Sequence, residues 1–426
     1  MHKRAGWHSI RLLVAALALV CFLLPSQAAD NNSALKKRAL ALNELTGNLP
    51  IEGEIQRLKA DKKATKDLLH TAREMAQGAN QPFNYNAAYV LARAAEELRD
   101  FDTSGVFYHI CISEAKKVKS SHELSLGYAG VLEVLYDAKK YDKALEVCRE
   151  ILELKGSGQY VRNLKTIAHK LQIQTLAKQG KIKDALKLAD NQLAATPDDW
   201  TFLELKAVVL HDAGRDAEAA KTYEQLMERI PKDPNLDKDT QDVLVARCRY
   251  ILSGLYIDLD NVEQAVKQLK ILLEQRPNDP TYNNDLGYIW ADHNMNLAEA
   301  ERMIRKALTE DRKRRRKDPD LMPIDDHDNA AYLDSLGWVL FKEHKYDEAI
   351  KNLVQATADQ TEGQSSEIYD HLGEVYMADG KRSEAIAAWK KAIQVAKTKR
   401  DQKIKARVEK KLKQAEQAKV SASKQD

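Results

Sequence analysis

The sequence contains none of the short motifs that mark the common catalytic sites. It has no glycine-rich phosphate loop, no nucleophile elbow and no paired-histidine metalloprotease signature. Its 11 histidines are scattered singly, and no carboxylate stands alone in an apolar stretch that would raise its pKa. We therefore predict no catalytic, cofactor-binding or metal-binding residues. An enzyme with its active site in a groove is the less favoured alternative.

Cysteine is scarce, with four residues in the whole chain. Removing the N-terminal leader described below leaves Cys111, Cys148 and Cys248, each within a helical apolar pattern. An odd number cannot pair completely, and no spacing of cysteine and histidine suggests zinc. We expect these three to be buried, unpaired thiols.

Only one apolar run is long enough to consider as a membrane segment, Leu12–Leu24, and it lies at the N-terminus. Basic residues precede it, and Ala28 ends a short stretch typical of signal-peptidase cleavage. Thirteen helical residues span about 20 Å, less than the ~30 Å hydrocarbon core. Residues 1–28 are therefore predicted to be a signal peptide of an exported, periplasmic protein. The alternative is an inner-membrane anchor through residues 10–24.

The mature chain also lacks an excess of charge of one sign. The formal net charge is +3, and Lys3, Arg4 and Arg11 of the leader account for it. A balanced remainder gives no general case for nucleic-acid binding. Charged residues make up 31% of the chain, which suits exposed faces of many helices.

What the sequence does contain is an internal repeat, clearest between Ala330 and Ala396. Five positions recur 36 residues later with the same or a similar residue type: Leu336, Gly337, Leu340, Ala349 and Ala356 become Leu372, Gly373, Tyr376, Ala385 and Ala392. Small side chains at these places let the two helices of a hairpin approach closely. The period and the residue types are those of a helix–turn–helix repeat.

On these residues the chain resembles the tetratricopeptide repeat family over about residues 85–396. The resemblance implies an all-α fold, a right-handed α-solenoid of about eight helical hairpins. A small residue should open each second helix: Ser104, Ala144, Ala185, Ala219, Ala265, Ala300, Ala349 and Ala385. Gly180, Gly214 and Gly380 are expected at hairpin turns.

The ends of the chain do not repeat. Residues 29–84 are predicted to be a helical N-terminal cap or lead-in, with a charged helix from about Glu54 to Gln77. Residues 397–426 predict a basic C-terminal capping helix and tail, with Ile404, Val408 and Leu412 as a narrow apolar stripe. Attraction of this basic helix to an acidic surface is the alternative.

A charged insertion, residues 309–329, interrupts the repeats. It carries a basic run, Arg312–Lys317, followed by two prolines and the acidic run Asp325–Asp328. We expect a mobile loop, cut first near Arg314–Arg316 by a protease. The favoured interpretation is a solvated, partly helical extension whose two halves neutralise each other, and the alternative is a basic contact for an acidic partner.

In the family that this chain resembles, first helices line a concave groove in which peptides dock. The groove-facing spacing selects nine residues in the C-terminal half: Tyr250, Tyr282, Asn284, Tyr288, Asp334, Trp338, Phe341, Asp370 and Glu374. Aromatic faces beside carboxylates suit a peptide with apolar and basic side chains. Alternatively, Trp338 and Phe341 pack against the neighbouring hairpin.

These observations together predict a non-catalytic scaffold or adaptor of the cell envelope that binds a protein or peptide partner in its groove and needs no cofactor. The alternative within the same class is a membrane-anchored subunit of an envelope assembly or secretion complex. The identity of the partner and the oligomeric state stay open.

Overall fold

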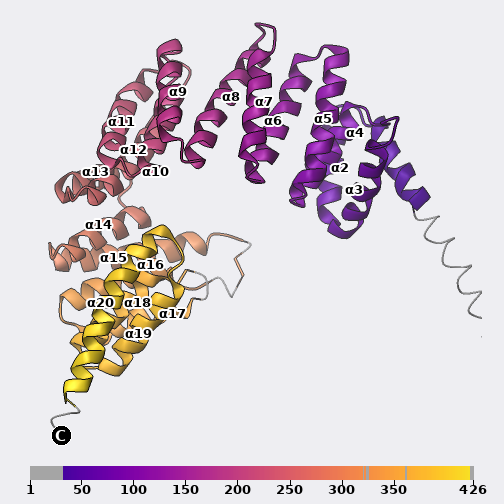
Figure 1. The fold of residues 1–426 in the computed structure, drawn as a ribbon. Helices are drawn as coiled ribbons and strands as arrows, with labels where there is room; N and C mark the ends of the chain where they lie inside the picture. The colour runs from indigo at the N-terminus through magenta and orange to yellow at the C-terminus, as the bar shows by residue number, and fades with distance from the viewer. Residues whose placement is uncertain (1–31, 320, 323–325, 360–361, 423–426) are drawn as a thin grey trace, which may run out of the picture. The chain divides into compact units, whose positions relative to one another are not determined.

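The computed structural model describes residues 32–319, 321–322, 326–359 and 362–422, and these residues form helices and short connections, with no strand (Figure 1). The predicted signal peptide lies outside the described residues. No described helix is both long enough and apolar enough to cross a membrane. The described chain divides into two compact units, with the boundary along the chain between Arg215 and Asp216.

The first unit begins with a helix over residues 32–41 and continues through ten further helical elements. They are η1 (Leu42–Glu44), α2 (Asn48–Ala60), α3 (Lys62–Ala76), α4 (Tyr85–Glu97), α5 (Phe101–Val118), α6 (Ser121–Asp137), α7 (Tyr141–Glu153), α8 (Gln159–Lys178), α9 (Ile182–Ala195) and α10 (Thr201–Asp212).

The second unit contains the remaining helices and ends in the long helix α20. Its elements are α11 (Asp216–Arg229), η2 (Ile230–Lys232), α12 (Lys238–Asp258), α13 (Val262–Gln275), α14 (Pro280–Asp292), α15 (Leu297–Arg315), α16 (Ala330–Lys342), α17 (Tyr346–Ala358), α18 (Ser366–Ala378), α19 (Arg382–Val395) and α20 (Lys399–Ala422).

The eight predicted second helices are α5, α7, α9, α11, α13, α15, α17 and α19. The predicted small residue is the fourth residue of each one, from Ser104 to Ala385, and all eight are fully buried. The all-α solenoid of about eight hairpins is therefore confirmed, together with the register of its repeats.

Each hairpin turn contains a residue with left-handed backbone, and the turn between α14 and α15 contains a second one, Asn296. Gly180, Gly214 and Gly380 have φ of +76°, +72° and +77°, as predicted from their positions. The other five turns use residues with a side chain at the same place, and φ there lies between +52° and +64°: Arg99, Lys139, Asp260, Asn294 and His344. Left-handed backbone costs about 1–2 kcal/mol for such residues, so packing of the two helices must enforce it.

First helices of successive hairpins contact one another in both units. In the first unit α4 contacts α6, α6 contacts α8 and α8 contacts α10, and in the second α14, α16, α18 and α20 form the same kind of series. No comparable contacts join the second helices in the described chain. We call the layer of first helices the inner layer.

Two expectations about helix boundaries are wrong. The predicted helix from Glu54 to Gln77 is two helices, because Asp61 accepts a hydrogen bond from the backbone N–H of Ala64 and starts α3 anew. The insertion does not begin as a loop at Thr309, because α15 continues to Arg315, in agreement with the partly helical extension that is the favoured interpretation. Arginine and lysine are good helix formers, and the basic run extends the helix.

The C-terminal helix forms as predicted and packs on α19 and α18. Its predicted apolar stripe faces this contact: Val408 is fully buried, Ile404 is nearly so, and Leu412 packs against the same cluster. Because α20 follows α19 as each earlier first helix follows a second helix, it occupies the place of a ninth first helix.

Glycines in the middle of three first helices mark the closest helix approach. A Cβ added at Gly337 would lie 2.5 Å from Leu353 Cγ and 3.2 Å from the carbonyl oxygen of Ala349. Gly287 and Gly373 face Ile304 and Trp389 in the same way. We predict that Gly337→Leu lowers the free energy of unfolding by about 1–3 kcal/mol through overpacking.

Thermal unfolding followed by circular dichroism measures this effect. Gly254→Leu is the matched control, because a Cβ at Gly254 meets no atom within 4 Å. An unchanged melting temperature for Gly337→Leu would show that this contact does not hold the hairpin together.

Candidate functional site

All nine predicted groove residues lie on first helices of the second unit, and so on its inner layer. Tyr250 lies on α12, Tyr282, Asn284 and Tyr288 on α14, Asp334, Trp338 and Phe341 on α16, and Asp370 and Glu374 on α18. The structure therefore brings the predicted set to one layer, but it leaves the members very differently exposed.

A series of polar contacts connects neighbouring first helices. The hydroxyl of Tyr250 on α12 donates to Asp285 on α14 at 2.9 Å. The carboxylate of Asp334 on α16 lies 2.9 Å from Nδ1 of His371 on α18. In both pairs the second residue follows the first by about one repeat, 35 and 37 residues respectively. We call this series the inner ladder.

Trp338 is a packed residue rather than an exposed aromatic face. Its ring stacks on the buried imidazole of His371 with centroids 4.1 Å apart, and its Nε1 donates to Asp292 at 3.1 Å. Only 5% of Trp338 is exposed. The alternative interpretation of Trp338 as hairpin packing describes its surroundings, and truncating it would leave a cavity in the fold.

The inner face of α16 is closed by its two neighbours. Tyr288 of α14 donates to Glu367 of α18 at 3.2 Å, across the helix between them, and its ring lies 6.3 Å from that of His371. Every residue of α16 from Tyr332 to Leu340 is buried. No open groove passes over this helix.

The acids on α18 are already paired within the chain. Arg407 of α20 donates to Asp370 at 2.8 and 3.1 Å, and Lys411 donates to it at 2.7 Å and also contacts Glu374. Asp370 is fully buried. The sequence carried a signal for this pairing that we missed, since Arg407 follows His371 by 36 residues, the period of the last repeats.

What stays open is the α12 end of the predicted set. Tyr250 is 37% exposed, and its ring lies 5.6 Å from that of Tyr282 on α14. Gly254, one turn further along α12, is exposed and faces empty space. Phe341 and Glu374 are half-buried.

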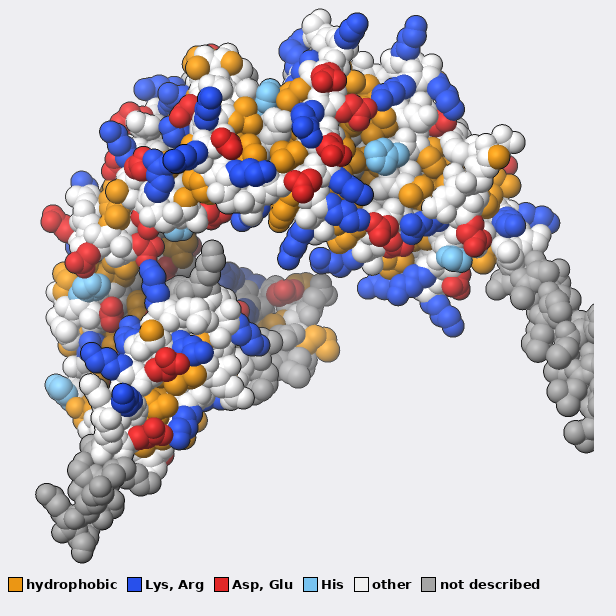
Figure 2. Space-filling view, viewed as in Figure 1, with side chains coloured by type: hydrophobic (Ala, Val, Ile, Leu, Met, Phe, Trp, Pro, Cys, Tyr) orange, Lys and Arg blue, Asp and Glu red, His pale blue; other side chains and the backbone are white. Residues whose placement is uncertain are grey.

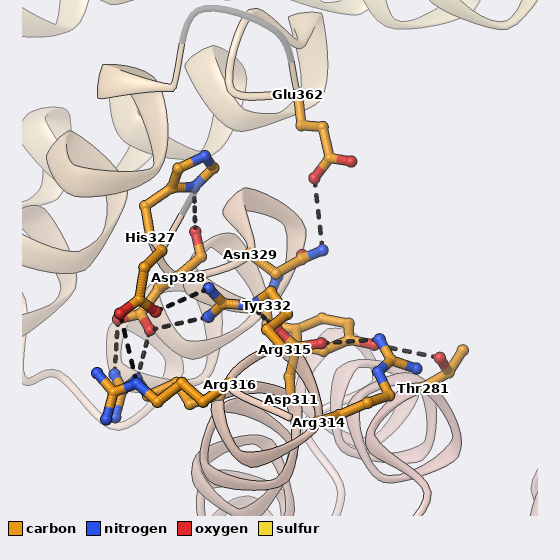
Figure 3. Close-up of polar contacts among 12 residues, drawn as sticks. Thr281, Asp311, Arg314, Arg315, Arg316, His327, Asp328, Asn329, Tyr332 and Glu362 are labelled. Carbon is orange, nitrogen blue, oxygen red and sulfur yellow. Dashed lines mark hydrogen bonds and ion pairs between the residues drawn. The ribbon is translucent and has the colours of Figure 1, made fainter. Parts of the chain in front are cut away.

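The charged insertion folds back on itself (Figure 3). Arg312 binds Asp328 through two nitrogens, Arg315 donates to Asp311 at 3.0 Å, and Arg316 pairs with Asp326. Arg312 holds the pKa of Asp328 below its usual value. The interpretation that the basic and acidic halves neutralise each other is therefore supported by these contacts.

The first unit has a feature that the sequence did not predict, a cavity of about 400 Å³ between α5, α6 and α7. Its walls include Val106, Val131 and Leu135, with Lys143 and Glu146 at the rim. Gly105 also lines the cavity, and a Cβ there would meet no atom within 4 Å. Two second helices, α5 and α7, and one first helix, α6, form its walls.

Surface charge gives no large patch of one sign in the view of Figure 2, where basic and acidic side chains are interspersed over both units. The described residues contain no group of three or more histidine, cysteine, aspartate or glutamate side chains placed to hold a metal. Cys111, Cys148 and Cys248 are buried thiols that form no disulfide among the described residues, as predicted. Burial raises the pKa of the Cys148 thiol to about 12.

Stacked helical hairpins, small residues at each helix crossing and an inner layer of first helices define a helical-repeat protein. The chain belongs to the tetratricopeptide repeat family. A tetratricopeptide repeat model matches residues 171–234 and 255–315, and a tetratricopeptide repeat-like domain matches residues 329–417.

Two relatives come from Pseudomonas aeruginosa. A TPR repeat-containing protein is 26% identical over 204 residues, covering 48% of this chain and 30% of the relative. The type IV pilus assembly protein PilF is 27% identical over 151 residues, covering 35% and 54%. The chain thus spans about a third and about half of these relatives. A solved tetratricopeptide repeat protein from Parabacteroides merdae is 16% identical, with a TM-score of 0.45 over 71% of this chain and 98% of that one.

The buried His371 predicts a pH dependence of stability. Burial opposes the charged imidazole, but Asp334, supported by Glu367 and Asp370 on its own helix, outweighs it and raises the pKa of His371 above 6.5. Tyr288 of α14 faces the ring as a neutral group, and Arg407 of α20 approaches only through Asp370. The stabilisation is fully present below pH 6.5 and is lost as pH rises through the folded-state pKa.

We therefore expect the melting temperature to fall between pH 6.5 and pH 9, and expect this slope to be weaker in His371→Gln, which has no proton to lose. Equal slopes in the two proteins would contradict a charged His371. His70→Gln is the control, because His70 is an exposed histidine.

The ion pairs of the insertion predict how a protease will attack it. Asp328→Asn removes the partner of Arg312 and weakens the end of α15, so trypsin should cut between Arg312 and Lys317 several-fold faster. Glu310→Gln is the control, since it removes an ion pair with the exposed Lys313 within α15 and leaves the pair between Arg312 and Asp328 intact. The rate is read from limited digestion and mass spectrometry of the fragments. First cuts within α16 or α17 would contradict this account of the insertion.

Proposed function

We propose that the protein is a non-catalytic scaffold of the cell envelope that binds peptide or protein partners along its inner layer. Membership of the tetratricopeptide repeat family supports protein binding, and the relative named as a pilus assembly protein supports a place in the envelope. An exported, periplasmic chain with a cleaved leader agrees with the basic, apolar start of the sequence.

The observation that carries this proposal is the pattern of exposed apolar residues on first helices. In the first unit Leu126 of α6 and Ile167 of α8 are 38% and 43% exposed. Each precedes the small residue of its second helix by 18 residues, as Glu367 precedes Ala385, and Glu367 is an inner-layer residue that contacts Tyr288. Because Leu126 and Ile167 occupy the same repeat position as Glu367, we assign their side chains to the inner layer as well.

Val208 of α10 extends the pattern. It is 39% exposed and shares the register of Trp338, since each precedes its small residue by 11 residues. In the second unit the exposed aromatic of the inner layer is Tyr250. Exposed apolar side chains repeated at inner positions lose unfavourable contact with water when a partner covers them.

Of the nine predicted groove residues, we propose the exposed Tyr250 and the half-buried Tyr288, Phe341 and Glu374 for partner contact, and Asn284 through its buried Oδ1, which has no hydrogen-bond partner in the described structure. Tyr282 is buried and supports the Tyr250 ring, with the two ring centroids 5.6 Å apart. Asp334, Trp338 and Asp370 shape the inner layer from within, because they are buried and already have partners. The role of these three is to hold neighbouring first helices in register.

A pair of glycine variants tests whether the inner layer binds partners. Gly254→Trp places a large side chain on the open face of α12, a first helix, and Gly105→Trp places the same side chain on α5, a second helix, at the cavity of the first unit. Neither added Cβ meets an atom within 4 Å. Replacing a helix-interior glycine should also favour the helix slightly, so both variants should keep their melting temperatures.

The mature chain and both variants are used to capture proteins from an envelope fraction, and captured proteins are quantified by mass spectrometry. We expect Gly254→Trp to reduce capture of the wild-type partners at least fivefold and Gly105→Trp to leave it unchanged. Loss of capture only in Gly105→Trp would move partner binding to the cavity between α5 and α7 and overturn the proposal.

A further inference from the structure

Asp285, on α14, is a half-buried carboxylate of the inner layer whose hydrogen-bond donors are both neutral. Asp334 has His371, and Asp370 has Arg407 and Lys411. Asp285 receives hydrogen bonds from the Tyr250 hydroxyl at 2.9 Å and from Nδ2 of Asn284 at 3.2 Å. Among the described residues, no nitrogen of lysine, arginine or histidine forms an ion pair with it within 4.0 Å.

Both donors to Asp285 are neutral, and this leaves its charge poorly compensated. Burial raises the pKa of Asp285, although the Tyr250 and Asn284 donors act in the opposite direction. A half-buried carboxylate is stabilised most strongly by a cation that also donates hydrogen bonds. Asp334 and Asp370, at neighbouring places in the inner layer, have such a cation within the chain, and Asp285 does not among the described residues.

Asn284, beside Asp285, also has an unused acceptor. It is 6% exposed, and its Oδ1 is buried without a hydrogen-bond partner in the described structure. The register of the inner ladder would pair it with Ser335 of α16, as Asp334 pairs with His371. The Ser335 hydroxyl instead donates to the carbonyl oxygen of Ala331 in its own helix. The contact between Asn284 of α14 and Ser335 of α16 that this register predicts is therefore absent from the inner ladder.

A carboxylate without a cation and an amide oxygen without a donor lie beside an open aromatic surface. Tyr250 is 37% exposed and packs at 5.6 Å from Tyr282. Gly254 leaves the adjacent inner face of α12 free of side chains. A planar, permanently charged group with several donors fits these requirements, because it stacks on tyrosine while donating to more than one oxygen.

We propose that Asp285, Asn284 and Tyr250 form a subsite for an arginine side chain of the bound partner. The guanidinium donates to the Asp285 carboxylate, Asn284 Oδ1 supplies the second acceptor, and the Tyr250 ring covers one face of the cation. This inference rests on the proposed function, and it names the partner chemistry that the inner layer selects. Lysine fits less well, since its ammonium is not planar and is more strongly hydrated.

The test begins with a phage-displayed random dodecapeptide library selected on the mature chain, with the Gly254→Trp chain as the counter-selection. We expect the enriched peptides to share an arginine. One such peptide is synthesised with a fluorescent label, in its arginine form and with citrulline, a neutral group of nearly the same shape, at that position. Affinities are measured by fluorescence anisotropy.

A cycle of the two changes isolates the contact. Replacing arginine by citrulline should weaken binding to the wild-type chain at least tenfold, and Asp285→Asn should weaken binding of the arginine peptide at least tenfold. With both changes present, the total loss of affinity should be smaller than the product of the two single losses. Asp258→Asn is the matched control, because it removes the same charge from an exposed acid near the end of α12. It should change affinity less than twofold.

The outcomes separate this inference from the proposed function. Enriched peptides without arginine, or citrulline and Asp285→Asn losses that multiply independently, refute the arginine subsite while leaving peptide binding intact. No enrichment over the Gly254→Trp counter-selection refutes both. Folding is checked by thermal unfolding at pH 7, where Asp285→Asn should not lower the melting temperature because it removes an unpaired, half-buried charge.

Discussion

The close approach of two helices within each hairpin is the constraint on which the rest of the structure depends. It requires a residue no larger than alanine or serine at the fourth position of every second helix, and glycine in the middle of α14, α16 and α18. Once this spacing is fixed, the larger side chains of the hairpin have one way to interdigitate. The next first helix then packs on a surface of defined shape.

The same constraint organises the inner layer. Because hairpins repeat with nearly constant geometry, a residue on one first helix meets its counterpart about one repeat later on the next. Tyr250 with Asp285, Asp334 with His371 and Asp370 with Arg407 all follow this rule. Polar residues that would disturb a helix interface singly are satisfied here in pairs, and buried pairs of this kind fix register at the expense of binding surface.

Sequence reasoning located the hairpins well because their evidence is local and repeated. Ser104 and Ala144 revealed second helices even where the glycine of the first helix is absent, and Gly180, Gly214 and Gly380 marked turns. It did not foresee the closed inner face of α16. That closure depends on Tyr288 meeting Glu367, 79 residues away, and on the tilt of three helices, which no single repeat encodes. The prediction of nine groove residues identified the correct layer but could not say which members neighbouring helices cover.

The position of α20 has a consequence for assembly. A repeat array whose last second helix is bare presents an apolar end on which another array can stack, and such ends allow growth into filaments. Here the place of the next first helix is filled from within the chain, by Val408 and Ile404 on one side, while Lys403, Lys410 and Lys413 face outward in water. A further copy approaching the outer face of α20 therefore meets lysine side chains of like charge instead of an apolar surface.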